Sequence, residues 1–361
     1  MKRIAIVGAG NAGSITALYI HNEILEDKEI LLYHSPNDHP IEKVGQGTVN
    51  PILELIHESL GCNWYDNPLE ATIKTGILYE GWGKKQDKIF HPFSMHEVAA
   101  HFVPEKLSKA VLESGLVNVI EKTIDNPEEE IDADMIFDCR GRHNRDSANY
   151  DTLINPLNSV LLAHKEGKDP DLTYTRTVAT PNGWTFIIPN LHSVSYGYLY
   201  NDTITSTQVA REDFMNRFRI YQDSLPLSFE NYVAKNMFVG ERTILQGNMY
   251  GFLEPMESTS INLCTHLCEQ AFNKDRIEGN NIMRRIVKEL ETFILWHYQF
   301  GSKYNTPFWE YAKSLPFNPD NKFKSIVDGS SNEYGFWQEE SFKNWKDGVY
   351  INPVKAYIGA L

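Results

Sequence analysis

The feature that most constrains the fold is a glycine pattern directly after the first apolar run of the chain. Arg3–Val7 has the length and composition of a buried strand, and Gly8, Gly10 and Gly13 follow it. Residues 14–20 then have helix-forming spacing. In such a strand–turn–helix the first glycine permits the turn, the second lets a pyrophosphate approach the backbone, and the third lets helix and strand pack closely. The pattern predicts dinucleotide binding; a glycine-rich turn without a ligand is the alternative.

One departure from that pattern occurs at the end of the second predicted strand, residues 29–33. An acidic residue normally stands there and binds the adenosine ribose. This chain has Tyr33, His34 and Ser35 instead. The missing carboxylate weakens an assignment to NAD in particular.

Composition and charge narrow the class of protein. The 361 residues, 42% of them hydrophobic, can form one large or two ordinary domains. The net charge of -14 disfavours a broad surface for nucleic acid. No apolar stretch is long enough to predict a membrane span, and the early first strand leaves no room for a signal peptide. We expect a cytoplasmic protein with buried, reduced thiols, because the cysteines lack a metal-binding spacing; they are Cys62, Cys139, Cys264 and Cys268.

Two segments in the first hundred residues combine glycines with apolar side chains. Residues 44–51 form a glycine-rich loop before a predicted helix at 52–60; the glycines either admit a planar ring or only make a turn. Residues 71–79 alternate like a strand, which places Lys74 on the face opposite Ile73 and Ile77. A solvated lysine at a sheet edge is the common alternative to a functional one. Aromatic residues follow at 81–83 and 90–93, as in a pocket wall.

The other predicted elements come from local patterns alone. A buried strand is expected at 133–141, and two neighbouring strands at 183–189 and 194–200, separated by a short polar turn. Helices are expected at 212–223, 228–235 and 281–296.

The stretch at residues 251–261 combines Glu254, Pro255 and Glu257 with three hydroxyl residues. Proline does not fit the middle of a helix, so we expect a tight loop that leads into a helix near Ser258, Thr259 or Ser260. The free amides at such a helix start favour an anion or a polar edge of a cofactor. In the alternative, the acidic groups only cap the helix.

Five of these segments together resemble the flavin-dependent halogenases of the tryptophan halogenase family. They are Gly8–Gly13, Val44-Gly-Gln-Gly-Thr-Val49, Lys74 within Ala-Thr-Ile-Lys-Thr-Gly-Ile, Gly183-Trp-Thr-Phe-Ile-Ile-Pro189 and residues 251–261. Two further pieces support the resemblance: Asp138-Cys-Arg-Gly141, and residues 293–309 with Trp296 and Trp309. The fold implied is α/β, an FAD-binding two-dinucleotide fold of the monooxygenase and halogenase kind. It would carry an antiparallel β-sheet substrate region and a helical C-terminal part.

The resemblance implies the following roles. FAD would lie on Gly8, Gly10 and Gly13, with a strap over the flavin ring and Leu253 beside it; the strap residues are Val44, Gly45, Gln46, Gly47 and Thr48. A separate flavin reductase would supply reduced FAD, and chloride, bromide or iodide would rest at the Thr259 and Ser260 amides. Oxidation of the halide would give hypohalous acid, which Lys74 would hold as a hydrogen-bonded acid or a haloamine. Glu257 would orient that electrophile or accept the proton of the ring.

Three departures from the family pattern affect the substrate and the reaction. Phe186 stands at the second tryptophan of the family's Gly-Trp-x-Trp-x-Ile-Pro signature, and Gln46 replaces a frequent glutamate. The chain is also shorter than typical members where tryptophan is bound. We therefore expect a small electron-rich aromatic substrate, indole- or phenol-like, in a pocket with His91, Phe93 and Trp345. The alternatives are a single-component flavin monooxygenase and a non-catalytic flavin-binding protein.

The same resemblance predicts how the chain is organised. Residues 1–265 would form the FAD-binding module with an inserted substrate-site sheet, and residues 266–361 a helical, aromatic-rich region that completes the substrate site. We expect no metal, no membrane and no nucleic acid as partners, and a homo-oligomer is possible.

Overall fold

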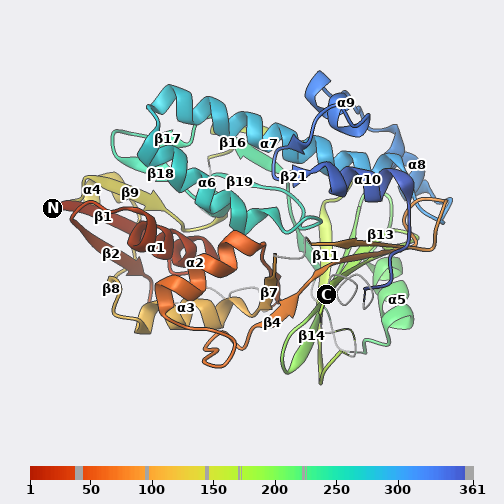
Figure 1. Ribbon diagram of the computed structural model, residues 1–361, viewed down its shortest axis with the longest axis horizontal. Helices are drawn as coiled ribbons and strands as arrows, with labels where there is room; N and C mark the ends of the chain where they lie inside the picture. Colours follow the sequence, from red (N-terminus) through yellow and green to blue (C-terminus); the bar gives the residue numbers. More distant parts are fainter. Residues whose placement is uncertain are drawn as a thin grey trace. The chain divides into compact units, whose positions relative to one another are not determined.

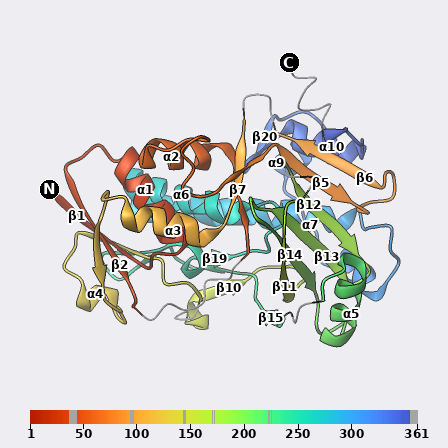
Figure 2. The ribbon, with the colours of Figure 1, turned by 90° about the horizontal axis from the view of Figure 1, so that it is seen from below.

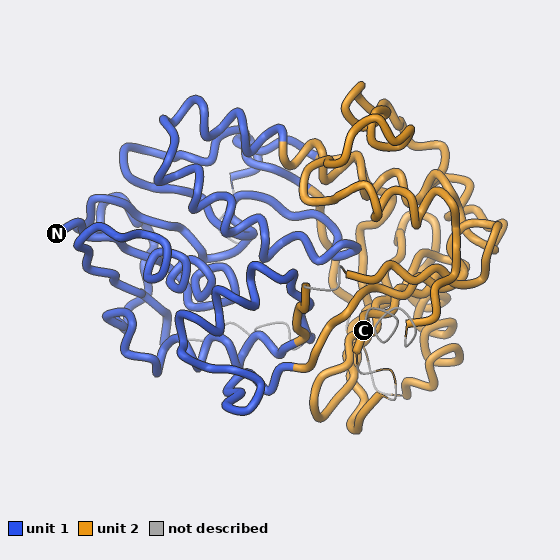
Figure 3. Tube along the Cα trace, viewed as in Figure 1, with its two compact units in different colours: residues 1–71, 102–152, 232–285 blue, residues 72–101, 153–231, 286–361 orange. Residues whose placement is uncertain are grey.

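The computed structural model describes residues 1–36, 44–93, 97–142, 146–169, 171, 173–221, 224 and 226–353 (Figure 1). Its chain forms two compact units, each built from three separate segments (Figure 3). The first unit contains residues 1–71, 102–152 and 232–285. The second contains residues 72–101, 153–231 and 286–361. Each unit is described by itself below.

The first unit is built on a six-stranded sheet in the order β17-β18-β9-β1-β2-β8. Its strands are β17 (Phe238–Val239), β18 (Thr243–Leu245), β9 (Met135–Asp138), β1 (Lys2–Val7), β2 (Lys28–His34) and β8 (Asn118–Glu121). All neighbours are parallel except β17 and β18. A parallel sheet with β1 inside it is the architecture that the glycine pattern predicts.

Helices cover one face of this sheet and a loop segment covers the other. Helix α1 (Asn11–Glu23) packs on β1 and β2, with α2 (Asn50–Leu60), α3 (Pro104–Glu113) and α6 (Thr259–Asn273) against it (Figure 2). On the other face Ala5 and Val7 pack with Ile124 and Ile131, which flank the short helix α4 (Pro127–Glu130). Alternate residues of β1 therefore face two different layers, as the two-residue period of a strand requires.

The second unit is built on a seven-stranded sheet in the order β15-β11-β14-β13-β12-β5-β6. Its strands are β15 (Pro226–Ser228), β11 (Ser159–Glu166), β14 (Ser193–Tyr200), β13 (Gly183–Pro189), β12 (Thr175–Thr180), β5 (Gly76–Glu80) and β6 (Lys88–Pro92). Neighbouring strands are antiparallel except β5 and β12. This confirms the predicted antiparallel sheet and the strand–turn–strand at 183–200.

Aromatic side chains fill both faces of the second sheet. Helix α5 (Thr207–Phe218) packs on β14 through Phe214 and the tyrosines of that strand. On the other face Trp184 of β13 donates a hydrogen bond from Nε1 to the Tyr298 hydroxyl, 3.0 Å away, in α7 (Arg276–Gln299). The C-terminal helices of this unit are α8 (Pro307–Ser314), α9 (Asn321–Val327) and α10 (Glu339–Asp347).

Several short elements complete the described chain. In the first unit they are β3 (Gln46–Gly47) and a three-stranded sheet of β10 (Tyr150–Thr152), β16 (Tyr232–Ala234) and β19 (Gly251–Phe252). In the second unit β4 (Thr72–Lys74) pairs with β7 (Ala99–Phe102), and β20 (Glu333–Tyr334) pairs with β21 (Trp337–Gln338). Short 3-10 turns occur at Ser147–Asn149 and Gly247–Met249.

Two predicted elements are wrong. The helix predicted at 228–235 is replaced by the end of β15 and by β16, whose three residues are all buried; a short apolar run does not distinguish a strand from a buried helix turn. The single strand predicted at 71–79 is broken at Thr75, because β4 pairs with β7 while β5 pairs with β6 and β12. The helix predicted at 212–223 begins earlier, at Thr207, and ends at Phe218; residues 222–223 lie outside the described chain.

The two units divide the chain differently from the predicted boundary near residue 265, which falls inside α6. The proposed functional division, with an FAD module and a region that completes the substrate site, stays a prediction. Among the described helices, none combines the length and the apolar character that a membrane crossing requires.

Candidate active site

The glycine loop of the first unit has two positions fixed by packing and one that packing leaves open. A Cβ at Gly8, whose φ is +109°, would lie 2.7 Å from the Cys139 carbonyl oxygen, and one at Gly13 would lie 1.7 Å from the carbonyl oxygen of Gly8. A Cβ at Gly10 would meet nothing within 4 Å. Gly8 and Gly13 are therefore required by the fold, whereas the protein alone gives no reason for a glycine at Gly10.

The residue after Gly10 carries a polar atom without a protein partner. Oδ1 of Asn11, the first residue of α1, is buried and makes no hydrogen bond within the described chain. Oxygen and nitrogen of an amide are assigned from their surroundings, so this atom position can accept or donate. The carbonyl oxygen of Ala9 is in contrast held twice, by the hydroxyl of Ser108 at 2.6 Å and by that of Ser14 at 3.2 Å. The Ala9 carbonyl is thus held by two hydrogen bonds, whereas a Cβ at Gly10 would meet no atom within 4 Å and Oδ1 of Asn11 has no hydrogen-bond partner in the described chain.

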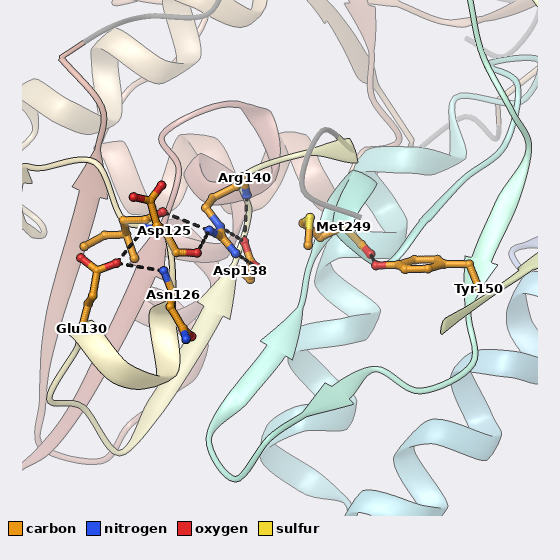
Figure 4. Close-up of polar contacts among 8 residues, drawn as sticks. Asp125, Asn126, Glu130, Asp138, Arg140, Tyr150 and Met249 are labelled. Atoms are coloured by element: carbon orange, nitrogen blue, oxygen red, sulfur yellow. Dashed lines mark hydrogen bonds and ion pairs between the residues drawn. The ribbon is translucent and has the colours of Figure 1, made fainter. Parts of the chain in front are cut away.

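The turn after β9 holds a buried ion pair (Figure 4). Arg140 donates from Nε and Nη2 to the two oxygens of Asp138, at 2.9 and 2.8 Å, and from Nη1 to the carbonyl oxygens of Ile124 and Asp125. The hydrogen bond to Asp138 raises the pKa of Arg140. Glu130 accepts hydrogen bonds from the backbone amides at the other end of the same loop. Arg140 therefore fixes the loop that follows β8.

The predicted strap and the predicted halide position both lie in the first unit. In the strap, Gly45 and Gly47 are buried with Val44 and Thr48, and Gln46 is half-buried, as is Leu253. Helix α6 begins at Thr259, and Ser258 before it has a φ of +54°. The Ser258 side chain makes no capping hydrogen bond, and no acidic residue lies in the first turn of α6. The helix thus lacks a cap from the Ser258 hydroxyl, and the amides of Thr259 and Ser260 belong to its first turn, where backbone amides have no partner within the helix.

Two carboxylates precede that helix start. Glu257 is buried, with 8% of its surface exposed, and Glu254 is fully buried. A carboxylate is rarely this buried in a loop unless it is paired or functional. The expected acidic residue of the site, Glu257, is thus held inside the protein, together with Glu254.

The cysteines are free and buried, as predicted. Burial raises the pKa of Cys264 to about 12, and burial with neighbouring groups raises the pKa of Cys139. These thiols are therefore protonated and poor nucleophiles.

Lys74 of the second unit is fully buried, so the solvated-edge alternative is wrong. Its Nζ lies 5.3 Å from the ring centroid of Phe93, within the range of a cation–π contact. The Phe93 ring in turn lies 6.3 Å from that of His91, edge to face. The structure thus brings together three of the four predicted site residues of this unit.

Helix α10 connects the fourth residue to the same neighbourhood. The two ring nitrogens of His91 lie 3.2 Å from the Ser341 hydroxyl and 3.3 Å from the Asn344 amide. Trp345, next in the helix, is buried among Tyr79, His297, Trp82 and Phe300. Its indole Nε1 has no hydrogen-bond partner within the described chain. The role of Trp345 in a substrate pocket stays a prediction.

Sequence reasoning missed His101, which is fully buried on β7 opposite Thr72. Burial and the charge of Lys74 lower the pKa of His101 well below its usual value, so the ring is neutral. The sequence around His101 indicates only that Ala99 and His101, two residues apart, share one face of a strand. It does not indicate which strand pairs with that strand.

Phe186, the departure from the family signature, is buried on β13 opposite Gly197 of β14. A Cβ at Gly197 would lie 2.1 Å from the Phe186 ring. The missing side chain of Gly197 therefore provides the space for that ring.

A family model described as tryptophan halogenase matches residues 3–114 and 102–355, nearly all of the sequence. The chain belongs to the tryptophan halogenase family. It is 26% identical over 476 aligned positions to the tryptophan 7-halogenase RebH of Lentzea aerocolonigenes, covering 97% of this chain and 88% of that protein. It is 24% identical to the tryptophan 6-halogenase ThaL of Streptomyces albogriseolus over 55% of this chain and 41% of that protein.

Solved structures of flavin-dependent halogenases have the same fold. A halogenase from Brevundimonas sp. BAL3 superposes with a TM-score of 0.79 at 18% identity, covering 99% of this chain and 94% of that one. A tryptophan halogenase from Shewanella frigidimarina gives 0.82 at 17% identity, with coverages of 99% and 92%. The predicted fold class is confirmed, and so is the predicted enzyme class, an FADH2-dependent oxidoreductase of this family.

The residues of the glycine loop fit the flavin nucleotide that a flavin-dependent family implies. Gly10 leaves space in front of the backbone, and Asn11 directs an unpartnered polar group from the start of α1. Both observations fit a phosphate-bearing ligand at the helix N-terminus, and nothing in the described part of the chain accounts for them.

Proposed function

We propose that this member of the tryptophan halogenase family halogenates a small electron-rich aromatic compound, indole- or phenol-like. The observation that carries the proposal is the burial of Lys74 in the second unit beside Phe93 and His91. Lysine is rarely fully buried, and a buried lysine is commonly paired or has a chemical task. Hypohalous acid provides such a task, because an amine can hold an electrophilic halogen.

FAD would be held by Gly8, Gly10 and Gly13, with Asn11 directed at its phosphates. Bound in its reduced form, delivered by a separate flavin reductase, it would with dioxygen supply the two-electron oxidation of halide to hypohalous acid. The halide would rest at the outward amides of Thr259 and Ser260, since a large spherical anion suits backbone donors. Chloride, bromide and iodide all meet that description.

Lys74 and Glu257 would then act on the substrate. Lys74 would hold hypohalous acid by a hydrogen bond or as a haloamine, excluded from water. A ring carbon would take the halogen, and Glu257 would accept the proton that the ring loses. From hypohalous acid the leaving group is hydroxide, to which Glu257 would pass that proton to give water. From a haloamine, whose formation has already released water, the leaving group is the Lys74 nitrogen, which would take the same proton.

Turnover with a flavin reductase tests this function directly. The protein would be incubated with FAD, reductase, NADH, oxygen and bromide or iodide, together with a panel of indoles and phenols. We expect halogenated product by mass spectrometry, its loss in Lys74→Ala, and its retention in Lys84→Ala, which removes an exposed lysine. Halide-dependent product that survives Lys74→Ala would refute the proposed mechanism. Oxygenated product formed without halide would instead support the flavin monooxygenase. Phe186, which departs from the family signature, is one of the residues that would affect this choice of reaction.

A further inference from the structure

A chain of buried hydrogen bonds passes through His101 and includes Thr72, which lies two residues before Lys74 in β4. The Thr72 hydroxyl donates to the carbonyl oxygen of Pro189 at 2.9 Å. Its single proton is thereby used, so Thr72 must accept from Nδ1 of His101, 3.4 Å away. Nε2 of the neutral ring then accepts from the hydroxyl of Thr175 at 2.8 Å. The order of donors and acceptors in this chain is therefore fixed.

The register of β4 and β7 places this chain next to Lys74. Thr72 is opposite His101 and Lys74 is opposite Ala99 in the antiparallel pair. Residues two apart share a face, so His101 and Lys74 are diagonal neighbours on one face, about 7–8 Å apart at the backbone. All of the polar groups in the chain are buried; His101 and Lys74 are fully so.

Thr75, the residue after Lys74, is also held by hydrogen bonds. The backbone amide and the hydroxyl of Thr75 both donate to the carbonyl oxygen of Thr173, at 2.7 and 2.8 Å. The amide of Phe93 donates to the carbonyl oxygen of Thr75 at 2.8 Å. Lys74 therefore lies between two anchored residues, Thr72 and Thr75. The Thr75 anchor uses backbone groups and a hydroxyl, whereas the Thr72 hydroxyl is held by the Pro189 carbonyl oxygen and by the His101 ring.

We propose that His101 is a positioning residue that holds the Lys74 amine in its working orientation through Thr72. A histidine suits this task because its ring can donate to Thr72 and accept from Thr175 at once while carrying no charge. A permanent cation at the same place would repel the Lys74 ammonium. An apolar residue would remove the donor to the Thr72 oxygen and the acceptor of the Thr175 hydroxyl, and Thr72 would keep only its bond to Pro189. The inference rests on the proposed function for the chemical role of Lys74. The hydrogen bonds of His101 are independent of that function.

Chemical labelling tests the position of Lys74 without any turnover. Lysine labelling with isotopic formaldehyde and a hydride donor, read by peptide mass spectrometry, would be compared among wild type, His101→Ala, His101→Asn and His101→Gln. Asparagine keeps a donor where Nδ1 stands, and glutamine keeps an acceptor where Nε2 stands. We expect Lys74 to label at least tenfold faster in His101→Ala and His101→Gln and within about threefold of wild type in His101→Asn. The matched control is His192→Asn, which alters an exposed histidine of the same unit and leaves Lys74 labelling unchanged.

A turnover measurement separates positioning from general loss of structure. We expect His101→Ala to keep halide oxidation within about twofold, read by a soluble scavenger of hypohalous acid, while aromatic product falls at least tenfold at unchanged KM. His101→Asn should recover most of that product. Equal labelling of Lys74 in all four proteins, or equal loss of scavenged acid and product, would overturn the positioning role. If wild type makes no halogenated product but the labelling order holds, the positioning stands and the proposed function fails.

Discussion

The glycine loop of the first unit and the lysine strand of the second unit contribute to the proposed function in opposite ways. In the loop, Gly8 and Gly13 are needed by the packing of β1 and α1 as much as by any ligand. In the strand, Lys74 is fully buried, and the proposed function gives its amine a chemical task. The glycines of the loop thus serve the fold and the proposed function together, whereas the role proposed for the Lys74 amine belongs to the function. Substitutions in the two regions should therefore change activity and stability to different extents.

The largest effect is expected at Lys74. Lys74→Met keeps most of the side-chain volume and removes the amine, so the rate of halogenated product should fall at least about a hundredfold. A methionine of similar volume keeps most of the packing around the site, so thermal unfolding should show a folded variant. Product rate and thermal unfolding of the same preparation provide the test.

The matched control for that substitution is Arg140→Met in the first unit. Arg140 is tied to Asp138 and to two backbone carbonyls, so its loss leaves a buried carboxylate without its partner. It should lower stability by about 2–3 kcal/mol. A loss of product in Arg140→Met as large as that in Lys74→Met would contradict the contrast between a structural and a functional buried cation.

The glycine loop allows a comparison within one region. In Gly13→Ala the new Cβ would lie 1.7 Å from a backbone oxygen, so we expect the protein without FAD to lose about 3 kcal/mol of stability. In Gly10→Ala the new Cβ has open space, so stability should be unchanged while FAD affinity falls roughly tenfold or more. Urea unfolding without FAD and FAD titration by flavin fluorescence separate the two. Unchanged FAD binding in Gly10→Ala would show that the space at Gly10 does not serve the cofactor.

The same contrast explains what the sequence could predict. The glycine loop can be predicted because the strand, the turn residues and the helix are adjacent in the sequence, and each has its own local sequence pattern. The strand face that carries Lys74 can also be predicted from the alternation of apolar and polar residues. Its burial was not, because β4 is covered by the pairing with β7, about 25 residues further along the chain. The break at Thr75 has the same origin, since the two halves of the predicted strand join different partners.

His101 was missed for a related reason. Its importance depends on three hydroxyl or carbonyl partners that are remote in sequence: Thr72, Thr175 and, through Thr72, Pro189. No local pattern connects them. The family resemblance assigned roles to residues inside recognisable motifs, and it could not assign one to a histidine whose partners are set by strand register.

The smallest predicted effect concerns the pH dependence of stability. The pKa of His101 in the folded protein is well below the 6.5 of a free histidine, because the ring is buried and Lys74 is charged nearby. Below about pH 6.5 the unfolded chain therefore binds a proton at His101 that the folded protein does not. This contribution to the free energy of unfolding is therefore fully present above about pH 6.5 and is lost as the pH falls, by about 1.4 kcal/mol for each pH unit.

His101→Asn removes this titration while keeping the donor to Thr72. Urea unfolding of wild type and His101→Asn at several values between about pH 7 and about pH 5 should show the wild-type stability falling more steeply by that amount. His57 and His266, whose pKa values are also lowered, are present in both proteins, so their contributions cancel in the difference. Parallel curves would mean that the ring at His101 takes up a proton in the folded protein. A protonated ring cannot accept from Thr175, so parallel curves would break the hydrogen-bond order on which the anchoring of Lys74 depends.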